Sequence, residues 1–237
     1  MVIDKNRILV GFLILFFFLF AYFIKFDLLI LAFISILIIL ELYKSKFINN
    51  ISDFFIIMLF ISIFPFTLSN NQIIYFLNFL LISFTIINIL FPSFYLKKIF
   101  FISISIFVFN FFFISFMDRS LLYFIIFIAF FNDTIAYVFG RILKGPLIIP
   151  TISPKKTWSG TLISFILTSL VIYQFNISIL LSLVLSISLF IGDIFFSYIK
   201  RKINIKDFSN FLRGHGGILD RLDSMYFFIM IASITLL

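Results

Sequence analysis

Charged residues in this chain gather in one stretch, residues 192–224. It contains four of the ten acidic residues, six of the eighteen basic residues and the only histidine. The segments around it are almost entirely hydrocarbon, since 63% of all residues are hydrophobic and only 12% are charged. Charge next to apolar membrane segments is costly and is typical of function, so we interpret this stretch as a site of chemistry.

Asp193 is the first candidate within that stretch. Ser182, Ser186, Asp193 and Ser197 follow one another at spacings of four, seven and four, so they share one face of a helix. Close helix packing explains Ser182 and Ser186, because small residues are favoured there. It does not explain a carboxylate that is followed by lysines one or two turns later. Asp193 is therefore predicted to belong to a site.

Asp220 and Asp223 are the second pair of candidates. They stand three residues apart just before the last apolar segment, and on a helix both would face the same way. Acidic residues at that place also compensate a helix dipole. Gly214, Gly216 and Gly217 directly before them favour a loop whose backbone amides turn toward an anion such as a phosphate.

Other positions keep two interpretations. Asp133 lies in an apolar segment and is either functional or a polar clamp between helices. His215 either serves a phosphate as a hydrogen-bond donor or base, or only orders its loop. Lys155 and Lys156 set membrane topology and contact headgroups in one interpretation. In the other they begin a helix whose free backbone amides favour phosphate.

Taken together, these groups are the parts of a phosphoryl-transfer centre. Carboxylates hold Mg²⁺, which prefers hard oxygen ligands and accepts bound waters and substrate phosphates. Lysines and arginines neutralise a polyphosphate, and positioning with charge neutralisation supplies most of the rate. The chain has no cysteine, which excludes thiolate metal sites, disulfides and thiol catalysis.

The apolar composition predicts the elements that position these groups. No single soluble core hides so much apolar surface, so we expect an all-α, polytopic membrane protein. A window of about 20 residues predicts about nine transmembrane helices. They span roughly 8–24, 28–42, 54–68, 73–91, 99–117, 121–139, 161–174, 177–199 and 225–237.

The basic residues predict the orientation of these helices. With the N-terminus in the cytoplasm, sixteen basic residues fall on that side, and only Lys25 and Arg119 fall on the other. A missed or invented helix would mix the two sets. The C-terminus is therefore predicted to lie outside. The net charge of +8 is then explained by membrane orientation and by contact with anionic lipid headgroups, rather than by binding of nucleic acid.

The polar residues predict a division along the chain. Residues 1–130 are expected to form a hydrophobic helical scaffold. Residues 131–237 are expected to form a catalytic helical region with two cytoplasmic loops, 140–160 and 200–224.

Three runs closely resemble the hallmark motif of the phosphatidate cytidylyltransferases, or CDP-diacylglycerol synthases: Ser197–Arg201, Lys206–Asp207 and Gly214–Ser224. The runs at 153–160 and 133–141 are also similar to that family. The resemblance covers about 133–224, and the first 130 residues match only as a hydrophobic helical region.

The resemblance implies that CTP and phosphatidic acid give CDP-diacylglycerol and pyrophosphate. It also implies a requirement for Mg²⁺, which the family is thought to bind in a paired-metal centre. The implied metal ligands are Asp193, Asp220, Asp223 and Asp133, with Asp193 and Asp220 leading. The implied catalytic residues are Asp193, Asp220, Asp223, Lys200 and His215. The implied substrate contacts are Ser153, Lys155, Lys156, Thr157, Ser197, Arg201, Lys206, Gly214, Gly216, Gly217 and Arg221.

The chain also departs from the family pattern. Phe196 and Ser159 stand where glutamates are usual, Arg213 stands where proline is frequent, and Ile135 stands where glycine is common. The lost carboxylates bear on metal affinity and rate more than on the class of reaction.

The resemblance implies a bacterial inner-membrane enzyme whose active site faces the cytoplasm. Its partners would be the two substrates and the bilayer, without nucleic acid, and a homodimer is left open. One alternative is a related membrane nucleotidyl or phosphoryl transferase that acts on another lipid phosphate. The other is a small ion or solute transporter that uses Asp133 and Asp193 inside the membrane.

Overall fold

The computed structural model describes residue 23 and residues 27–45, 47, 71–91, 96–209 and 216–237. The predicted segments 8–24 (apart from residue 23) and 54–68 lie outside these ranges. The chain forms two compact units whose segments alternate along the sequence. The first unit contains Met1–Phe26, Tyr123–Lys206 and Leu222–Phe228. The second contains Asp27–Leu122, Asp207–Arg221 and Ile229–Leu237.

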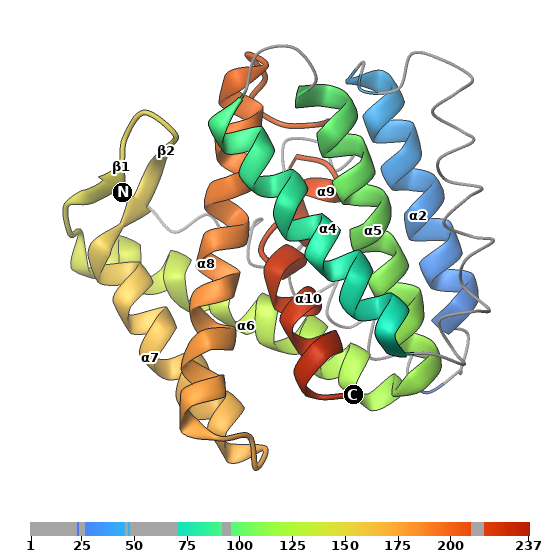
Figure 1. Ribbon diagram of the computed structural model, residues 1–237. Coiled ribbons are helices and arrows are strands. Elements are labelled where there is room, and N and C mark those ends of the chain that lie inside the picture. Colours follow the sequence, from blue (N-terminus) through green and yellow to red (C-terminus); the bar gives the residue numbers. More distant parts are fainter. Residues whose placement is uncertain (1–22, 24–26, 46, 48–70, 92–95, 210–215) are drawn as a thin grey trace. The chain divides into compact units, whose positions relative to one another are not determined.

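Helices account for most of the described chain (Figure 1). Their bounds are α2 Asp27–Lys44, α4 Asn71–Leu90, α5 Leu96–Met117, α6 Arg119–Leu143, α7 Trp158–Gln174, α8 Ile179–Lys202, α9 Leu219–Leu222 and α10 Met225–Thr235. Every predicted segment in the described ranges falls on one of these helices, which confirms the all-α class. The predicted count of nine helices and the predicted sides of the termini stay predictions.

Polar residues mark where the helices begin and end. Thr157 caps α7 by accepting a hydrogen bond from the Gly160 amide at 3.3 Å, and Ser178 caps α8 in the same way from Leu181 at 3.4 Å. Asn176 and Asn204 follow α7 and α8 with φ angles of 62° and 58°. This left-handed conformation ends a helix, and asparagine tolerates it better than most residues.

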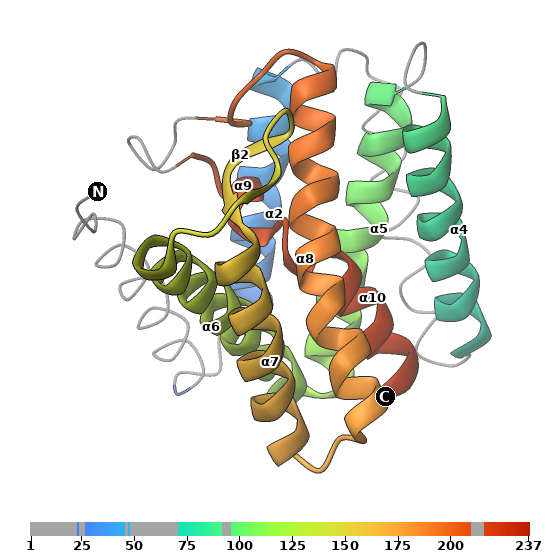
Figure 2. The same ribbon diagram turned by 90° about the vertical axis from the view of Figure 1, so that its left-hand side faces the viewer.

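In the first unit, α7 and α8 lie side by side (Figure 2). The Ser186 hydroxyl on α8 donates a hydrogen bond to the Phe165 carbonyl on α7 at 3.0 Å. The prediction that Ser186 serves helix packing is thereby confirmed. Helix α7 also touches α6, because a Cβ on Gly160 would lie 2.4 Å from the Ala136 carbonyl oxygen. Only glycine permits this backbone-to-backbone crossing.

A short antiparallel hairpin connects α6 to α7. It pairs β1, Leu147–Ile149, with β2, Ser153–Thr157. Lys155 and Lys156 therefore lie on β2, and the prediction that they begin a helix is wrong, since α7 begins at Trp158. Pro154 holds the residue before it in an extended conformation, which favours pairing over a helical turn.

In the second unit, α5 packs against both α2 and α4. A buried polar chain joins α5, α4 and the end of α10. The Asn110 amide donates to Asn78 Oδ1 at 3.1 Å, and the Asn78 amide donates to the Ser233 hydroxyl at 3.0 Å. Asp27 at the start of α2 pairs with Arg119 at the start of α6. Such contacts hold helices together where no water is present to satisfy polar groups.

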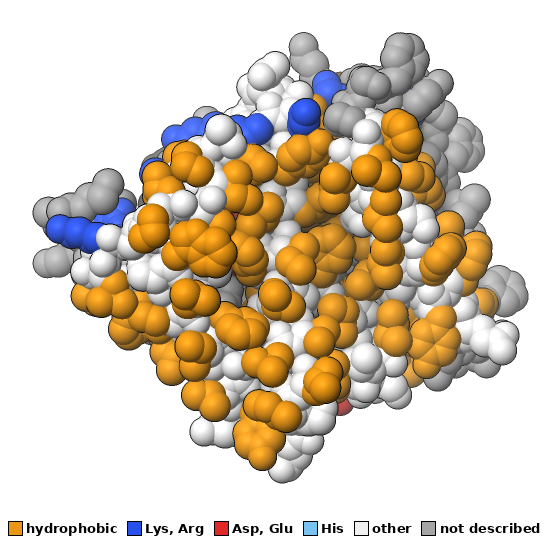
Figure 3. All heavy atoms as spheres, turned by 60° about the vertical axis from the view of Figure 1, so that its left-hand side comes forward, with side chains coloured by type: hydrophobic (Ala, Val, Ile, Leu, Met, Phe, Trp, Pro, Cys, Tyr) orange, Lys and Arg blue, Asp and Glu red, His pale blue; other side chains and the backbone are white. Residues whose placement is uncertain are grey.

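Large apolar side chains cover much of the face drawn in Figure 3. On α7 the exposed ones recur every three or four residues, at Leu162, Ile166, Leu170 and Tyr173. This spacing makes a continuous apolar stripe, far more than a soluble surface carries. In the described ranges, four helices are long and apolar enough to cross a bilayer: Gln72–Leu90, Leu96–Met117, Arg119–Leu143 and Ile179–Lys202. The chain is an integral membrane protein.

Candidate active site

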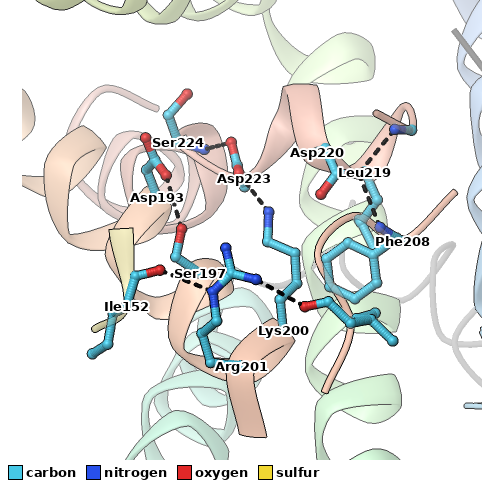
Figure 4. Close-up of polar contacts among 12 residues, drawn as sticks. Ile152, Asp193, Ser197, Lys200, Arg201, Phe208, Leu219, Asp220, Asp223 and Ser224 are labelled. Atoms are coloured by element: carbon cyan, nitrogen blue, oxygen red, sulfur yellow. Dashed lines mark hydrogen bonds and ion pairs between the residues drawn. The ribbon is translucent and has the colours of Figure 1, made fainter. Parts of the chain in front are cut away.

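Asp193 projects from α8 and has two polar partners in the first unit. Its carboxylate forms an ion pair with Lys156 of β2. Its Oδ1 accepts a hydrogen bond from the Ser197 hydroxyl, one helical turn later, at 3.5 Å (Figure 4). Lys156 Nζ also lies 5.3 Å from the centre of the Phe190 ring, a cation–π distance. The hairpin thus brings a lysine to the carboxylate that the sequence singled out.

Lys200 and Asp223 form a second charge pair in the same unit. Lys200 Nζ lies 3.7 Å from Asp223 Oδ2, and each side chain is only 8% exposed. Lys200 belongs to the last turns of α8, seven residues after Asp193, and Asp223 stands between α9 and α10. Breaking a buried pair leaves an uncompensated charge, so each partner strongly constrains the other.

Gly192 allows the segment that carries Asp223 to lie close to Asp193. A Cβ at this position would lie 2.6 Å from the Asp223 carbonyl oxygen and 2.9 Å from that of Ser224. The backbone of the 223–224 segment therefore rests directly on α8, beside Asp193. The Ser224 amide donates to Asp223 Oδ1 at 2.9 Å, which fixes that carboxylate further. The predicted residues Asp193, Ser197, Lys200, Lys156 and Asp223 thus gather in one compact unit.

Arg201 joins α8 to the hairpin turn. Its Nε donates to the Ile152 carbonyl at 3.1 Å, and its Nη1 donates to the Ile205 carbonyl at 3.1 Å. These bonds orient the guanidinium group at the edge of the site. Lys155 and Lys206 are exposed. The predicted contacts of all three residues with phosphates stay predictions.

The two positions that lack the family's glutamates have other partners here. Phe196 is fully buried, and its ring centre lies 5.2 Å from that of Tyr226. The Ser159 hydroxyl accepts from the Gly145 amide at 3.1 Å and donates to the Thr157 hydroxyl at 3.2 Å. Phe196 therefore serves the core of the unit, and Ser159 fixes the base of the hairpin.

Asp220 belongs to the second unit and is held by backbone amides. Its Oδ2 accepts from the Gly217 amide at 2.8 Å and from the Phe208 amide at 3.0 Å. Gly216 has a φ of +78°, and a Cβ there would lie 3.0 Å from the same oxygen. Glycine is therefore needed at 216 for both conformation and space. The phosphate contacts predicted for Gly216 and Gly217 stay predictions.

Glu41 on α2 is a polar residue that the sequence interpretation missed. It is the only glutamate of the chain and is 3% exposed. Within the second unit its carboxylate accepts hydrogen bonds from residues 209, 218 and 219. An acid between Leu40 and Leu42 is a signal of its own, because burying a carboxylate is costly. Its partners lie more than 160 residues away in sequence, so no spacing reveals them.

The remaining predicted residues that the structure describes lie on several elements. Asp133 is exposed on α6, Ser153 and Thr157 lie on β2, and Arg221 lies half-buried in α9. Gly214 and His215 lie outside the described residues. Among the residues that the structure describes, no three acidic or histidine side chains gather as a metal cluster. The predicted ligand set therefore stays a prediction.

Comparison with known proteins adds an independent finding. The family model described as "Cytidylyltransferase family" matches residues 5–237. The chain is 41% identical over 113 residues to a phosphatidate cytidylyltransferase of Rickettsia typhi, covering 39% of this chain and 48% of that protein. It is 39% identical over 120 residues to one of Staphylococcus epidermidis, covering 46% of each. The chain thus aligns with about half the length of these curated relatives. The match along nearly the whole sequence shows that the chain belongs to the cytidylyltransferase family.

Proposed function

We propose that this protein transfers a cytidylyl group from CTP to phosphatidic acid and releases pyrophosphate. A phosphate oxygen of the lipid attacks the α-phosphorus of CTP. The bond from that phosphorus to the bridging oxygen of the β-phosphate breaks, and CDP-diacylglycerol forms. Family membership supports the nucleotidyl chemistry, and the names of the relatives support this choice of lipid.

The observation that carries the proposal is the arrangement of two charge pairs, each of which has one member on α8. Two carboxylates, Asp193 and Asp223, each lie beside a lysine. Asp193 follows Gly192 in sequence, and Asp223 belongs to the segment that rests on Gly192. Phosphoryl transfer needs fixed positive charge for phosphates and fixed carboxylates for divalent cations. A purely structural ion pair would not need two such sets at one end of an apolar helix.

The donor atoms fit Mg²⁺. The carboxylate of Asp193 and the hydroxyl of Ser197, 3.5 Å apart, are the hard oxygens that this ion prefers. Asp193 with Ser197 would hold an ion in the first unit, and Asp220 is a separately proposed ligand within the second. Bound there, Mg²⁺ would neutralise phosphate charge and polarise the attacked phosphorus.

The lysines would provide the remaining positive charge. Lys156 is about a quarter exposed and is carried by the hairpin, so it would exchange Asp193 for a phosphate of CTP. Lys200 is buried and remains beside Asp223, so it would orient that carboxylate and contribute a fixed charge. Positioning and neutralisation are the main contributions that a protein makes to this reaction.

We further propose that nine helices span a bacterial inner membrane, with the site and the N-terminus in the cytoplasm and the C-terminus outside. The bias of basic residues supports this orientation. CTP is a cytoplasmic metabolite and phosphatidic acid is a membrane lipid. A site at the cytoplasmic surface of the membrane is therefore accessible to both. A homodimer stays a prediction, which the measured mass of the protein in nanodiscs checks.

The direct test uses the full chain purified into nanodiscs. With Mg²⁺, CTP and phosphatidic acid, we expect release of pyrophosphate and formation of CDP-diacylglycerol in equal amounts. Parallel reactions with dCTP and ATP measure the choice of nucleotide. If no CDP-diacylglycerol forms in nanodiscs that contain phosphatidic acid, the proposed reaction is rejected.

Two further arms separate the alternatives. A reaction with a polyprenyl phosphate in place of phosphatidic acid tests a transferase for another lipid phosphate. Product formed only with that acceptor would favour the related enzyme. Ion flux into sealed vesicles without any nucleotide chemistry would favour the transporter.

A further inference from the structure

Glu41 is a carboxylate buried at the end of an apolar helix, and the proposed reaction gives it no role. It lies three residues before the end of α2 at Lys44, and only 3% of its surface is exposed. A buried ionised carboxylate is stable only when its oxygens receive several hydrogen bonds. The groups that donate hydrogen bonds to Glu41 therefore indicate its role.

Three donors from one distant segment supply these bonds. Oε1 accepts from the Ile218 amide at 2.7 Å and from the Ser209 hydroxyl at 2.8 Å, and Oε2 accepts from the Leu219 amide at 2.9 Å. All belong to the second unit. Two of them are backbone amides, so the carboxylate fixes the path of the main chain rather than one side chain.

Gly217 permits this approach. A Cβ at that position would lie 2.6 Å from both carboxylate oxygens of Glu41. A side chain there would force either the Glu41 carboxylate or the segment to move, and the close contact between them would be lost. Gly217 thus has a specific structural role, because it allows the segment to contact α2 closely.

The segment that Glu41 holds leads directly into Asp220. Successive amides divide between two carboxylates: that of Gly217 donates to Asp220, and those of Ile218 and Leu219 donate to Glu41. Phe208, whose amide also donates to Asp220, stacks on Phe100 of α5 with ring centres 5.8 Å apart. Asp220 is therefore oriented by a backbone segment that Glu41 ties to α2.

We propose that Glu41 is a positioning residue for Asp220. It fixes the 217–219 backbone so that the Asp220 carboxylate is already oriented before a divalent cation binds. This inference rests on the proposed function, in which Asp220 is a metal ligand. Groups that orient metal ligands typically change affinity or activity by about 10–100-fold when they are removed.

The test compares Glu41→Gln with a matched control, Asp27→Asn. Gln keeps the size of the side chain but replaces one acceptor oxygen with an NH₂ group, so at least one amide loses its partner. Asp27 lies on the same helix, is 8% exposed and pairs with Arg119 instead. Two quantities are measured in nanodiscs: Mn²⁺ affinity by EPR and hydrogen exchange of the peptide 216–222.

For Glu41→Gln we expect Mn²⁺ binding about tenfold weaker than in the wild type. We also expect faster exchange at the amides of Ile218 and Leu219. In Asp27→Asn both quantities should match the wild type. Unchanged Mn²⁺ affinity in folded Glu41→Gln overturns the proposal, even if exchange rises, because the residue would then be purely structural. An equal loss of affinity in both variants overturns it as well.

Ser209→Ala keeps the proposal testable if Glu41→Gln does not fold. It removes one of the three donors and leaves both backbone amides in place. We expect Mn²⁺ binding about threefold weaker, and unchanged affinity overturns the proposal. If the wild type binds Mn²⁺ but releases no pyrophosphate, the proposed function fails while the role of Glu41 is still decided by these measurements.

Discussion

Asp193 and Asp220 are both carboxylates that we propose as metal ligands, but they are held in different ways. Asp193 is held by groups on side chains, the Lys156 ammonium group and the Ser197 hydroxyl. Asp220 is held by main-chain amides of Phe208 and Gly217. A lysine can leave its partner when another cation arrives, whereas a backbone amide cannot. Asp193 is thus suited to exchange partners, and Asp220 is suited to stay in place.

The largest effect is expected from removing these two charges. Asp193→Asn should lower turnover by on the order of 100-fold or more, because it removes a ligand without a substitute. Asp220→Asn keeps an oxygen that accepts the two amides, so the loop should remain ordered while turnover falls to a similar extent. Turnover is measured as pyrophosphate release, and folding as the thermal unfolding midpoint.

Asp118→Asn is the matched control for these two variants, since Asp118 lies outside the site and only caps α6. Near-normal turnover in Asp220→Asn would show that Asp220 only stabilises its own loop. Near-normal turnover in Asp193→Asn would remove it from the proposed ligands.

The two lysines should separate stability from binding. Lys200→Met removes the cation 3.7 Å from the buried Asp223 carboxylate and should destabilise the fold by about 3 kcal/mol. Lys156→Met breaks a pair that is about a quarter exposed, so it should change stability by less than about 1 kcal/mol. Lys156→Met should instead raise the KM for CTP.

Unfolding in nanodiscs and steady-state kinetics measure these effects. A reversed pattern, with Lys156 governing stability and Lys200 the KM, would contradict the assignment of a fixed and an exchangeable charge.

The smallest effect concerns Asp118, which caps α6 far from both carboxylates in sequence. The Ser120 hydroxyl lowers the pKa of Asp118, with help from the amides of Leu121 and Ser120, while partial burial opposes them. A lowered pKa in the folded state stabilises the protein above the ordinary value of 3.8, and this contribution is lost as pH falls below it. The unfolding midpoint of the wild type should therefore decline more steeply there than that of Asp118→Asn. Identical slopes would deny the cap a role in acid stability.

Hydropathy predicted the helices well because each described span is predominantly apolar. Predicted segments such as 121–139 fell short of α6, Arg119–Leu143, since polar residues at helix ends lower a hydropathy window without stopping hydrogen bonding. The hairpin escaped prediction because strands of three and five residues leave no periodic signal.

The site was predictable only in part. The spacing of Asp193 and Ser197 showed one helix face, and the structure confirms that they contact each other. The pairing of Asp193 with Lys156 depends on the hairpin, and the bonds of Glu41 depend on contacts between distant segments. Such tertiary contacts cannot be derived from local spacing, however clear each separate residue type is.

The close crossing of α6 and α7 at Gly160 has a mechanical consequence. That contact, with the Ser159 bonds to Gly145 and Thr157, clamps the base of the strand that carries Lys156. The strand is therefore attached at its base to two membrane helices. A change in the lateral pressure or thickness of the surrounding lipid would tilt those helices. The tilt would then change the position of the Lys156 ammonium group.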